Sequence, residues 1–182
     1  MKRHSSAGTG AGEPDWPAQV FALLKAAKVR HVAYVPYAGH ARLIDAAIRD
    51  PEMIATALTT EEEGIGLLLV AWLGGERGVL LMQSSGVGNC INTLSLHANV
   101  RFPLPMLITM RGEWAEFNPW QIPMGRATAA SLELMGVLTS RADRAADVED
   151  AVAGALDIAY ASEAACAVLL GQRLIGRKVW TR

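Results

Sequence analysis

The chain has 182 residues, of which 51% are hydrophobic, so it is long enough and apolar enough to form one domain with a substantial core. Its 17 lysines and arginines nearly balance its 18 aspartates and glutamates, which gives no electrostatic reason to expect a nucleic acid or a membrane surface as a partner. Both cysteines lie in apolar segments and the first residues lack the apolar core of a signal peptide, so we expect a reduced, cytoplasmic protein.

The predicted elements alternate between helices and strands from residue 16 onward. In chain order we expect a helix near 16–28, a strand at 31–35, a helix near 40–49, a strand at 54–58, a helix that opens with three glutamates, a strand at 79–83, a helix near 88–99, a strand at 104–110, helices near 125–135 and 147–161, and a strand at 167–170. This alternation predicts a doubly wound α/β fold, with a mostly parallel sheet and helices on both faces. Residues 1–14 are rich in small residues and are expected to be a flexible tail before a single domain at 15–182.

Ligands of such a sheet bind beyond the carboxyl ends of its strands, which here are the loops after Val35, Leu58, Gln83 and Met110. The longest apolar run, residues 65–73, is too short to span a bilayer. We therefore expect no membrane partner and look for a small-molecule site in these loops.

Three consecutive glutamates, Glu61, Glu62 and Glu63, precede this apolar run. Thr60 and Glu63 have the spacing of a capping box, in which Thr60 accepts from first-turn amides and Glu63 folds back toward the cap. The helix body is apolar on nearly all sides, so it is either buried all round or in contact with another chain. Charge at the head of such a helix is costly unless it is used or paired. Helix capping and a functional carboxylate therefore both remain open for this segment.

A glycine-bearing segment, Ser84-Ser85-Gly86-Val87-Gly88-Asn89, follows the strand at 79–83. Glycines between a strand and a helix can bring backbone amides up to a phosphate. However, Ile91 stands where a dinucleotide fingerprint needs its third glycine, and no Lys-Ser/Thr pair follows as in a P-loop. The alternatives are a ligand loop at a strand end and a tight turn with Asn89 as the helix cap.

Together these segments resemble the pyrimidine-binding domain of thiamine-diphosphate enzymes, and most of all the alpha subunits of sulfopyruvate decarboxylase and the related phosphonopyruvate decarboxylases. The resemblance spans nearly the whole chain after the tail. It is carried, in order, by Val35-Pro36, Glu62-Glu63-Gly64, Trp72, Met82-Gln83 with the glycine segment and Asn92, Pro103-Leu104-Pro105, Ile108-Thr109-Met110-Arg111-Gly112 and Gln121-Ile122-Pro123-Met124-Gly125-Arg126-Ala127-Thr128.

The resemblance implies that a glutamate hydrogen-bonds the ring nitrogen of the cofactor's aminopyrimidine and so activates the cofactor. It places this role on Glu62 first, with Glu63 as the alternative. It also implies a cofactor pocket lined by Gln83, Ser84, Ser85, Gly86, Gly88 and Asn89.

The chain contains no Gly-Asp-Gly motif, with which such enzymes bind the diphosphate through Mg²⁺. The resemblance therefore implies an alpha subunit without a metal site of its own, and a beta subunit that holds the diphosphate and Mg²⁺. The active site would lie between the two chains, at an interface formed by the glutamate helix and by the helix that carries Leu94 and Leu96.

Four basic residues and one aromatic loop are further candidates. His40 follows the first strand, where either a catalytic or substrate role or a solvated capping histidine fits. His97 lies late in a helix, so that capping competes with substrate binding. Arg111 at a strand end, with Arg126 as second choice, could bind an anionic group of the substrate, and surface ion pairing is the alternative. Residues 114–120 form an aromatic loop, either a lid or a packed surface loop.

We therefore expect the alpha subunit of a heteromeric thiamine-diphosphate 2-oxo acid decarboxylase that acts on a small substrate like sulfopyruvate or phosphonopyruvate. The aromatic loop leaves open a less polar 2-oxo acid. A carboligase or lyase subunit with the same cofactor and a non-catalytic α/β binding subunit are the alternatives.

Overall fold

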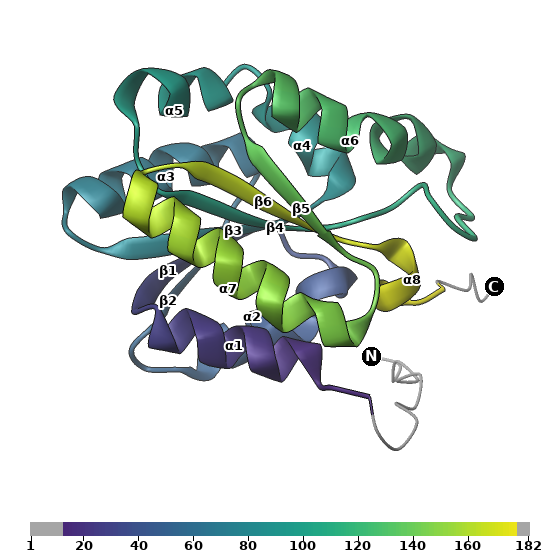
Figure 1. Ribbon diagram of the computed structural model, residues 1–182, viewed down its shortest axis with the longest axis horizontal. Coiled ribbons are helices and arrows are strands. Elements are labelled where there is room, and N and C mark those ends of the chain that lie inside the picture. The colour runs from purple at the N-terminus through teal and green to yellow at the C-terminus, as the bar shows by residue number, and fades with distance from the viewer. Residues whose placement is uncertain (1–12, 178–182) are drawn as a thin grey trace.

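The computed structural model describes residues 13–177, which form a six-stranded sheet between two layers of helices (Figure 1). Every pair of neighbouring strands is parallel, and the strand order is β2-β1-β3-β4-β6-β5. The strands are β1 (Val29–Tyr34), β2 (Ile54–Ala57), β3 (Arg77–Gln83), β4 (Leu104–Thr109), β5 (Leu138–Ala142) and β6 (Ala165–Leu170). The predicted doubly wound α/β fold is confirmed, since its strands are parallel and helices connect them across both faces.

The helices divide into two layers (Figure 1). One face of the sheet is covered by α1 (Trp16–Ala26), α2 (Ala41–Arg49) and α7 (Ala145–Ser162), and the other by α3 (Glu61–Leu73), α4 (Ser84–Cys90), α5 (Leu94–Val100) and α6 (Ile122–Leu134). A short helix α8 (Gln172–Ile175) follows β6, and single 3₁₀ turns occupy Ala38–His40 and Pro119–Gln121. Each layer closes its own apolar core, and the central strands β4 and β6 are buried along their whole length because both faces are covered.

The structure corrects the expected helix at 88–99. Helix α4 begins at Ser84, directly after β3, and a break at residues 91–93 separates it from α5. The glycine segment is therefore helical rather than a loop, and Asn89 lies inside α4 rather than at a helix cap. Glycine at residue 86 lets this helix pass close to α3, where a Cβ would lie 2.3 Å from Glu61 Cδ.

Strand β5 was not predicted from the sequence. Its five residues, Leu-Thr-Ser-Arg-Ala, include three polar ones, and only Ala142 is buried. An edge strand of this kind lacks the apolar run that identified the inner strands. The predicted tail at 1–14 lies, except for Glu13 and Pro14, outside the described residues. Within residues 13–177 no helix combines the length and apolarity needed to cross a membrane.

Candidate functional site

The carboxyl ends of all six strands lie at one edge of the sheet, which we call the carboxyl edge. The connections that leave β1 and β3 turn to opposite faces, into α2 and α4, so the sheet has a switch point between these neighbours. The loop after β1 also reaches over the adjacent strand ends. The Tyr37 hydroxyl donates to the Met82 carbonyl oxygen at 2.7 Å, and a Cβ at Gly39 would lie 2.7 Å from Thr109 Oγ1. This loop therefore closes one side of the edge at which α3 begins.

Glu61 is the buried carboxylate of the glutamate segment. It is the first residue of α3, and only 7% of its surface is exposed. Asn89 Nδ2 of α4 donates to its Oε2 at 2.9 Å. On the same helix, a Cβ at Gly86 would lie 2.3 Å from Glu61 Cδ, so any larger residue there would displace the Glu61 side chain. The helix dipole favours a negative charge at this position. Glu61 is thus enclosed by α4 and held by one defined donor.

Glu62 and Glu63 are less enclosed. Glu62 is half-buried and accepts a hydrogen bond from the Thr60 hydroxyl, whereas Glu63 is exposed and accepts from the Thr59 amide at 2.9 Å. The predicted capping box is only half formed: Glu63 folds back as expected, but Thr60 makes no side-chain cap with the first-turn amides. The sequence ranks Glu62 first, whereas the fold buries Glu61.

A sequence signal for Glu61 existed. The buried residues of α3 are Glu61, Gly64, Ile65, Leu68 and Ala71, which recur at helical spacing. Glu61 therefore lies on the same stripe as the core residues of its helix, and Glu62 does not.

The residues expected to line a cofactor pocket are spread along the end of β3 and the whole of α4. Ser84 is buried, and its Oγ accepts from the Arg111 amide at 3.1 Å. Gln83 and Ser85 are half-buried, whereas Gly88 and Asn89 are exposed. A Cβ at Gly88 would make an ordinary contact, 3.5 Å from Met124 Sδ of α6. Helix α4 thus lies between Glu61 on one side and the start of α6 on the other.

His40 is buried in the loop after β1. Its Nδ1 is hydrogen-bonded to the Tyr37 hydroxyl, whose hydrogen is donated to Met82, so Nδ1 carries the imidazole proton. Burial lowers the pKa of His40 to about 3, which keeps the ring neutral. Its other nitrogen, Nε2, is buried and has no hydrogen-bond partner among residues 13–177. His40 therefore presents an unsatisfied acceptor close to the carboxyl edge.

Tyr37 connects this loop with the glutamate. Burial raises the pKa of Tyr37 well above its usual value, and the negative charge of Glu61 raises it further. Burial likewise raises the pKa of the Cys90 thiol in α4 to about 12, with Glu61 and Glu62 as further causes. Glu61 is therefore close enough to act electrostatically on both the β1 loop and α4.

Arg111 follows β4 and is neutralised within the chain. It is 8% exposed, and its Nε and Nη2 donate to the two carboxylate oxygens of Glu116 at 2.7 and 2.6 Å. Hydrogen bonds from Arg111 lower the pKa of Glu116 to about 2. Of the other basic candidates, Arg126 is exposed on α6.

His97 lies at the opposite edge of the sheet. It belongs to the end of α5, its ring lies beside Phe102, and Nε2 contacts the carbonyl oxygen of Glu163 at 3.3 Å. These neighbours precede the first residues of β4 and β6. The structure therefore does not bring His97 together with Glu61, Arg111 or His40.

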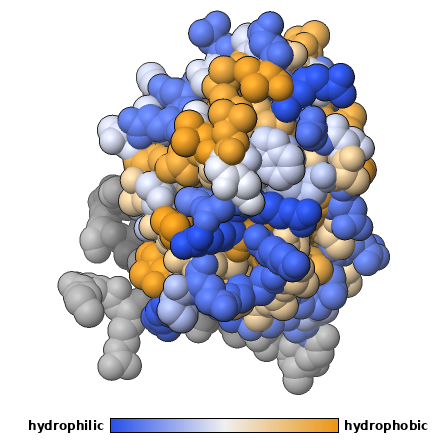
Figure 2. Space-filling view, turned by 90° about the vertical axis from the view of Figure 1, so that its left-hand side faces the viewer, coloured by the Kyte–Doolittle hydropathy of each residue, from blue (hydrophilic) through white to orange (hydrophobic). Residues whose placement is uncertain are grey.

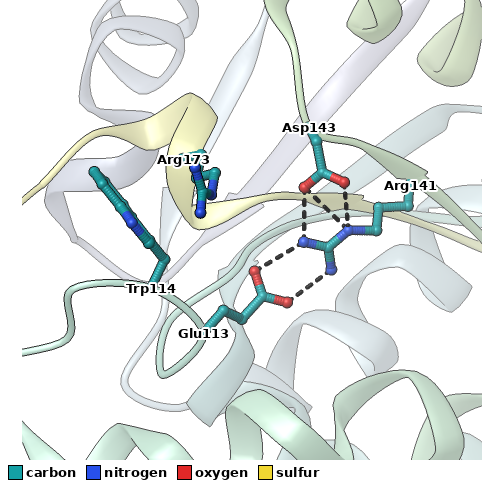
Figure 3. A pocket seen from close by; sticks show the side chains of 5 residues that line it. All are labelled: Glu113, Trp114, Arg141, Asp143 and Arg173. Atoms are coloured by element: carbon teal, nitrogen blue, oxygen red, sulfur yellow. Dashed lines mark hydrogen bonds and ion pairs between the residues drawn. The ribbon is translucent and has the colours of Figure 1, made fainter.

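A charged cavity of about 360 Å³ opens at the carboxyl edge near β5, and the sequence did not predict it (Figure 3). It is lined by Glu113, Trp114, Arg141, Asp143 and Arg173. Arg141 lies between the two carboxylates and is hydrogen-bonded to both, while Arg173 stacks over the Trp114 ring. Arg141 and Asp143 belong to the overlooked strand β5 and its end, which explains why no sequence motif indicated this cavity.

Apolar surface gathers over one helical layer. In Figure 2 most strongly apolar side chains lie in the upper half, over the layer of α3 to α6. The exposed large apolar residues of these helices are Val70 and Leu73 of α3, Val100 of α5 and Leu134 of α6. Leu94, expected at an interface, packs instead in the chain's own core. Among residues 13–177, no group of three or more His, Cys, Asp or Glu side chains is placed to hold a metal ion.

Comparison with known proteins gives consistent relatives. No family model matches the chain. It is 32% identical, over 152 residues, to a sulfopyruvate decarboxylase subunit alpha from Methanothermobacter thermautotrophicus, and the match covers 83% of this chain and 92% of that protein. It is 37% identical to a phosphonopyruvate decarboxylase from Streptomyces viridochromogenes over 64% of this chain, which spans only 30% of that longer protein.

Among solved structures, a 2-oxoglutarate:ferredoxin oxidoreductase from Magnetococcus marinus superposes with a TM-score of 0.70 over 88% of this chain and 29% of its own. At 12% identity this likeness supports the fold alone.

Proposed function

Since the chain belongs to the family of sulfopyruvate decarboxylase alpha subunits, we propose that it is the alpha chain of a two-chain, thiamine-diphosphate-dependent decarboxylase of a 2-oxo acid. The observation that carries this proposal is the buried carboxylate of Glu61, held by Asn89 at the carboxyl edge of the sheet. A chain of this family that served only as a scaffold would have no need to enclose a charge there.

The polar groups at this edge fit the aminopyrimidine end of the cofactor. That group offers ring nitrogens and an exocyclic amine, which require a carboxyl group and hydrogen-bond acceptors opposite them. Glu61 supplies the carboxyl group, and His40 Nε2 is a buried acceptor without a partner among the described residues. Bound thiamine diphosphate supplies the electron sink that makes decarboxylation of a 2-oxo acid feasible.

Glu61 is proposed as the proton-handling residue of the site. Its carboxyl group would bind the ring nitrogen of the aminopyrimidine and hold or release a proton there. Asn89 orients the carboxylate through Oε2, and the missing side chain at Gly86 leaves it room. The sequence ranked Glu62 first, and the burial of the three glutamates leads us to propose Glu61 in its place.

A partner chain is proposed to hold the diphosphate and Mg²⁺. The sequence has no Gly-Asp-Gly motif, and the relative from Methanothermobacter thermautotrophicus is an alpha subunit by name. Val70 and Leu73, 68% and 73% exposed on α3, offer the partner an apolar contact surface on the helix that begins with Glu61.

The test is carbon dioxide release from a panel of 2-oxo acids by this chain alone, by a candidate beta chain alone and by their mixture, with thiamine diphosphate and Mg²⁺ present. Release by the mixture only is the expected result. Analysis of the second product distinguishes a decarboxylase, which frees an aldehyde, from a carboligase, which joins it to an acceptor. If the mixture binds no thiamine diphosphate and releases no carbon dioxide, the chain is a non-catalytic subunit instead.

A further inference from the structure

Two arginines near the proposed site, Arg111 and Arg141, are engaged by the chain's own acidic side chains. Arg111 is buried, and Glu116 binds it along the edge formed by Nε and Nη2. The Phe117 ring lies over the guanidinium, with 5.7 Å between Arg111 Cζ and the ring centroid. One edge and one face of this cation are thus covered by residues of the loop that follows it.

Glu116 is fixed by more than Arg111. The amide of Gly112 and the side chain of Gln172 donate to its Oε2 at 3.1 and 2.9 Å, and the amide of Asn118 donates to its Oε1 at 3.0 Å. Its pKa, lowered to about 2, keeps it charged at any physiological pH. An anion that displaced Glu116 from Arg111 would also break the hydrogen bonds that Glu116 accepts from both ends of the loop.

The neighbouring cavity repeats the pattern (Figure 3). Arg141 is held by Glu113 and Asp143, and Arg173 lies over Trp114 with 5.2 Å between Cζ and the ring centroid. Arg111, Arg141 and Arg173 carry three positive charges. They are balanced by the three negative charges of Glu113, Glu116 and Asp143, so the group has no net charge. A ligand with a second anionic group meets no net positive charge here, and burying an unpaired anion is costly.

The loop that engages Arg111 is also rich in exposed aromatic side chains. Trp114, Phe117 and Trp120 are all exposed, Trp120 by 83%. The loop borders the proposed site because the Arg111 amide donates to Ser84 of α4, the helix whose Gly86 and Asn89 contact Glu61.

We propose that the substrate is a 2-oxo acid with an uncharged, apolar tail, and that Glu116 sets this preference by withholding Arg111 from an anionic tail. The inference rests on the proposed function, since it presupposes decarboxylation of a 2-oxo acid at this edge. It separates this chain from the relatives named for sulfopyruvate and phosphonopyruvate, whose tails are a sulfonate and a phosphonate.

The first test compares kcat/KM of the assembled wild-type complex for four substrates: sulfopyruvate, phosphonopyruvate, 2-oxobutanoate and phenylpyruvate. We expect values at least about tenfold higher for at least one uncharged-tail substrate than for either anionic-tail substrate, a factor that corresponds to about 1.4 kcal/mol. Equal or higher values for sulfopyruvate or phosphonopyruvate overturn the inference and leave the proposed function standing. Absence of carbon dioxide from all four overturns the inference, and if the complex also binds no thiamine diphosphate, the proposed function falls with it.

The second test is Glu116→Gln, which removes the negative charge and keeps the shape. With Arg111 released, the ratio of kcat/KM for sulfopyruvate to that for the best uncharged-tail substrate should rise about tenfold or more. Glu133→Gln is the matched control, because Glu133 is exposed on α6 and its carboxylate accepts a hydrogen bond from the Thr139 hydroxyl, away from Arg111. An unchanged ratio in folded Glu116→Gln contradicts the role given to Glu116.

The double variant Arg111→Met with Glu116→Gln covers the case in which the single variant fails to fold, because replacing both partners leaves no unpaired buried charge. Without the cation, the double variant should keep the wild-type ratio. A rise in its ratio as large as that expected for Glu116→Gln would mean that Arg111 is not the withheld cation.

Discussion

Replacing Gly86 by alanine separates the position of the Glu61 carboxylate from the stability of the fold. An ideal Cβ at residue 86 would lie 2.3 Å from Cδ and Oε1 of Glu61 and 2.5 Å from Cγ. Non-bonded carbon atoms pack at about 3.5 to 4.0 Å, so the carboxylate has to move by roughly 1 Å or more. The side chain can rotate away at a cost of about 0.5 to 1.5 kcal/mol. Alanine is better than glycine within a helix by about 1 kcal/mol, which offsets that cost.

Gly86→Ala should therefore leave the free energy of unfolding within about 1 kcal/mol of wild type, as measured by urea unfolding. Displacement of a reacting group by about 1 Å costs on the order of 100-fold in rate, so kcat/KM for carbon dioxide release by the assembled complex should fall by that factor. Gly154→Ala is the control, because a Cβ at this helical glycine of α7 meets no described atom within 4 Å apart from its own helix backbone. Full activity of Gly86→Ala would refute the claim that the position of Glu61 matters.

Three other substitutions have defined outcomes. Glu61→Gln should lower kcat/KM of the complex by about 10²- to 10⁴-fold, whereas Glu62→Gln should leave it nearly unchanged. Both variants should still assemble with the partner chain. Equal losses of kcat/KM would contradict the assignment to Glu61. Because burial lowers the pKa of His40 from 6.5 to about 3, the unfolded chain binds a proton first as pH falls, and stability on the order of 5 kcal/mol is lost between these pH values. His40→Gln should flatten that part of the pH dependence in urea unfolding, and an unaltered slope would count against the buried neutral ring. The lowered pKa of Glu116 gives stability of roughly 3 kcal/mol that is present above pH 4.5 and lost as pH falls toward 2. Glu116→Gln should therefore weaken the loss of stability between pH 4.5 and 2 in urea unfolding. A loss as steep as that of wild type would contradict the buried ion pair.

The fold followed from the sequence because its signal is repeated along the chain. The inner strands carry apolar runs, the helices carry apolar stripes, and their alternation permits few arrangements other than a parallel sheet with covered faces. Strand β5 lacked this signal, since an edge strand with one buried residue looks like a polar connection.

The candidate site was predictable as a region and less so as a set of residues. The helical stripe of α3 would have identified Glu61 as the buried glutamate, had helix periodicity been applied to all three. The direction of a crossover helix would have placed His97 away from the other candidates, because a residue late in such a helix lies at the edge opposite the strand ends. The requirement for glycine at residue 86 was not predictable, because it arises from contact with a side chain 25 positions earlier.

The role of Arg111 also depended on tertiary contacts. A basic residue at a strand end indicates an anion site, but the sequence does not reveal that Glu116, five residues on, folds back onto it. No helical or strand spacing places these two residues together. The loop geometry does so, through the bonds that Glu116 accepts from Gly112 and Gln172.

The most direct test of the central claim is the rate at which the thiazolium C2 proton of thiamine diphosphate exchanges with deuterium in the assembled complex, without substrate. The assignment predicts that Glu61→Gln slows this exchange strongly while Glu62→Gln leaves it at the wild-type rate. Exchange at the wild-type rate in Glu61→Gln, or slowing in Glu62→Gln alone, would contradict it.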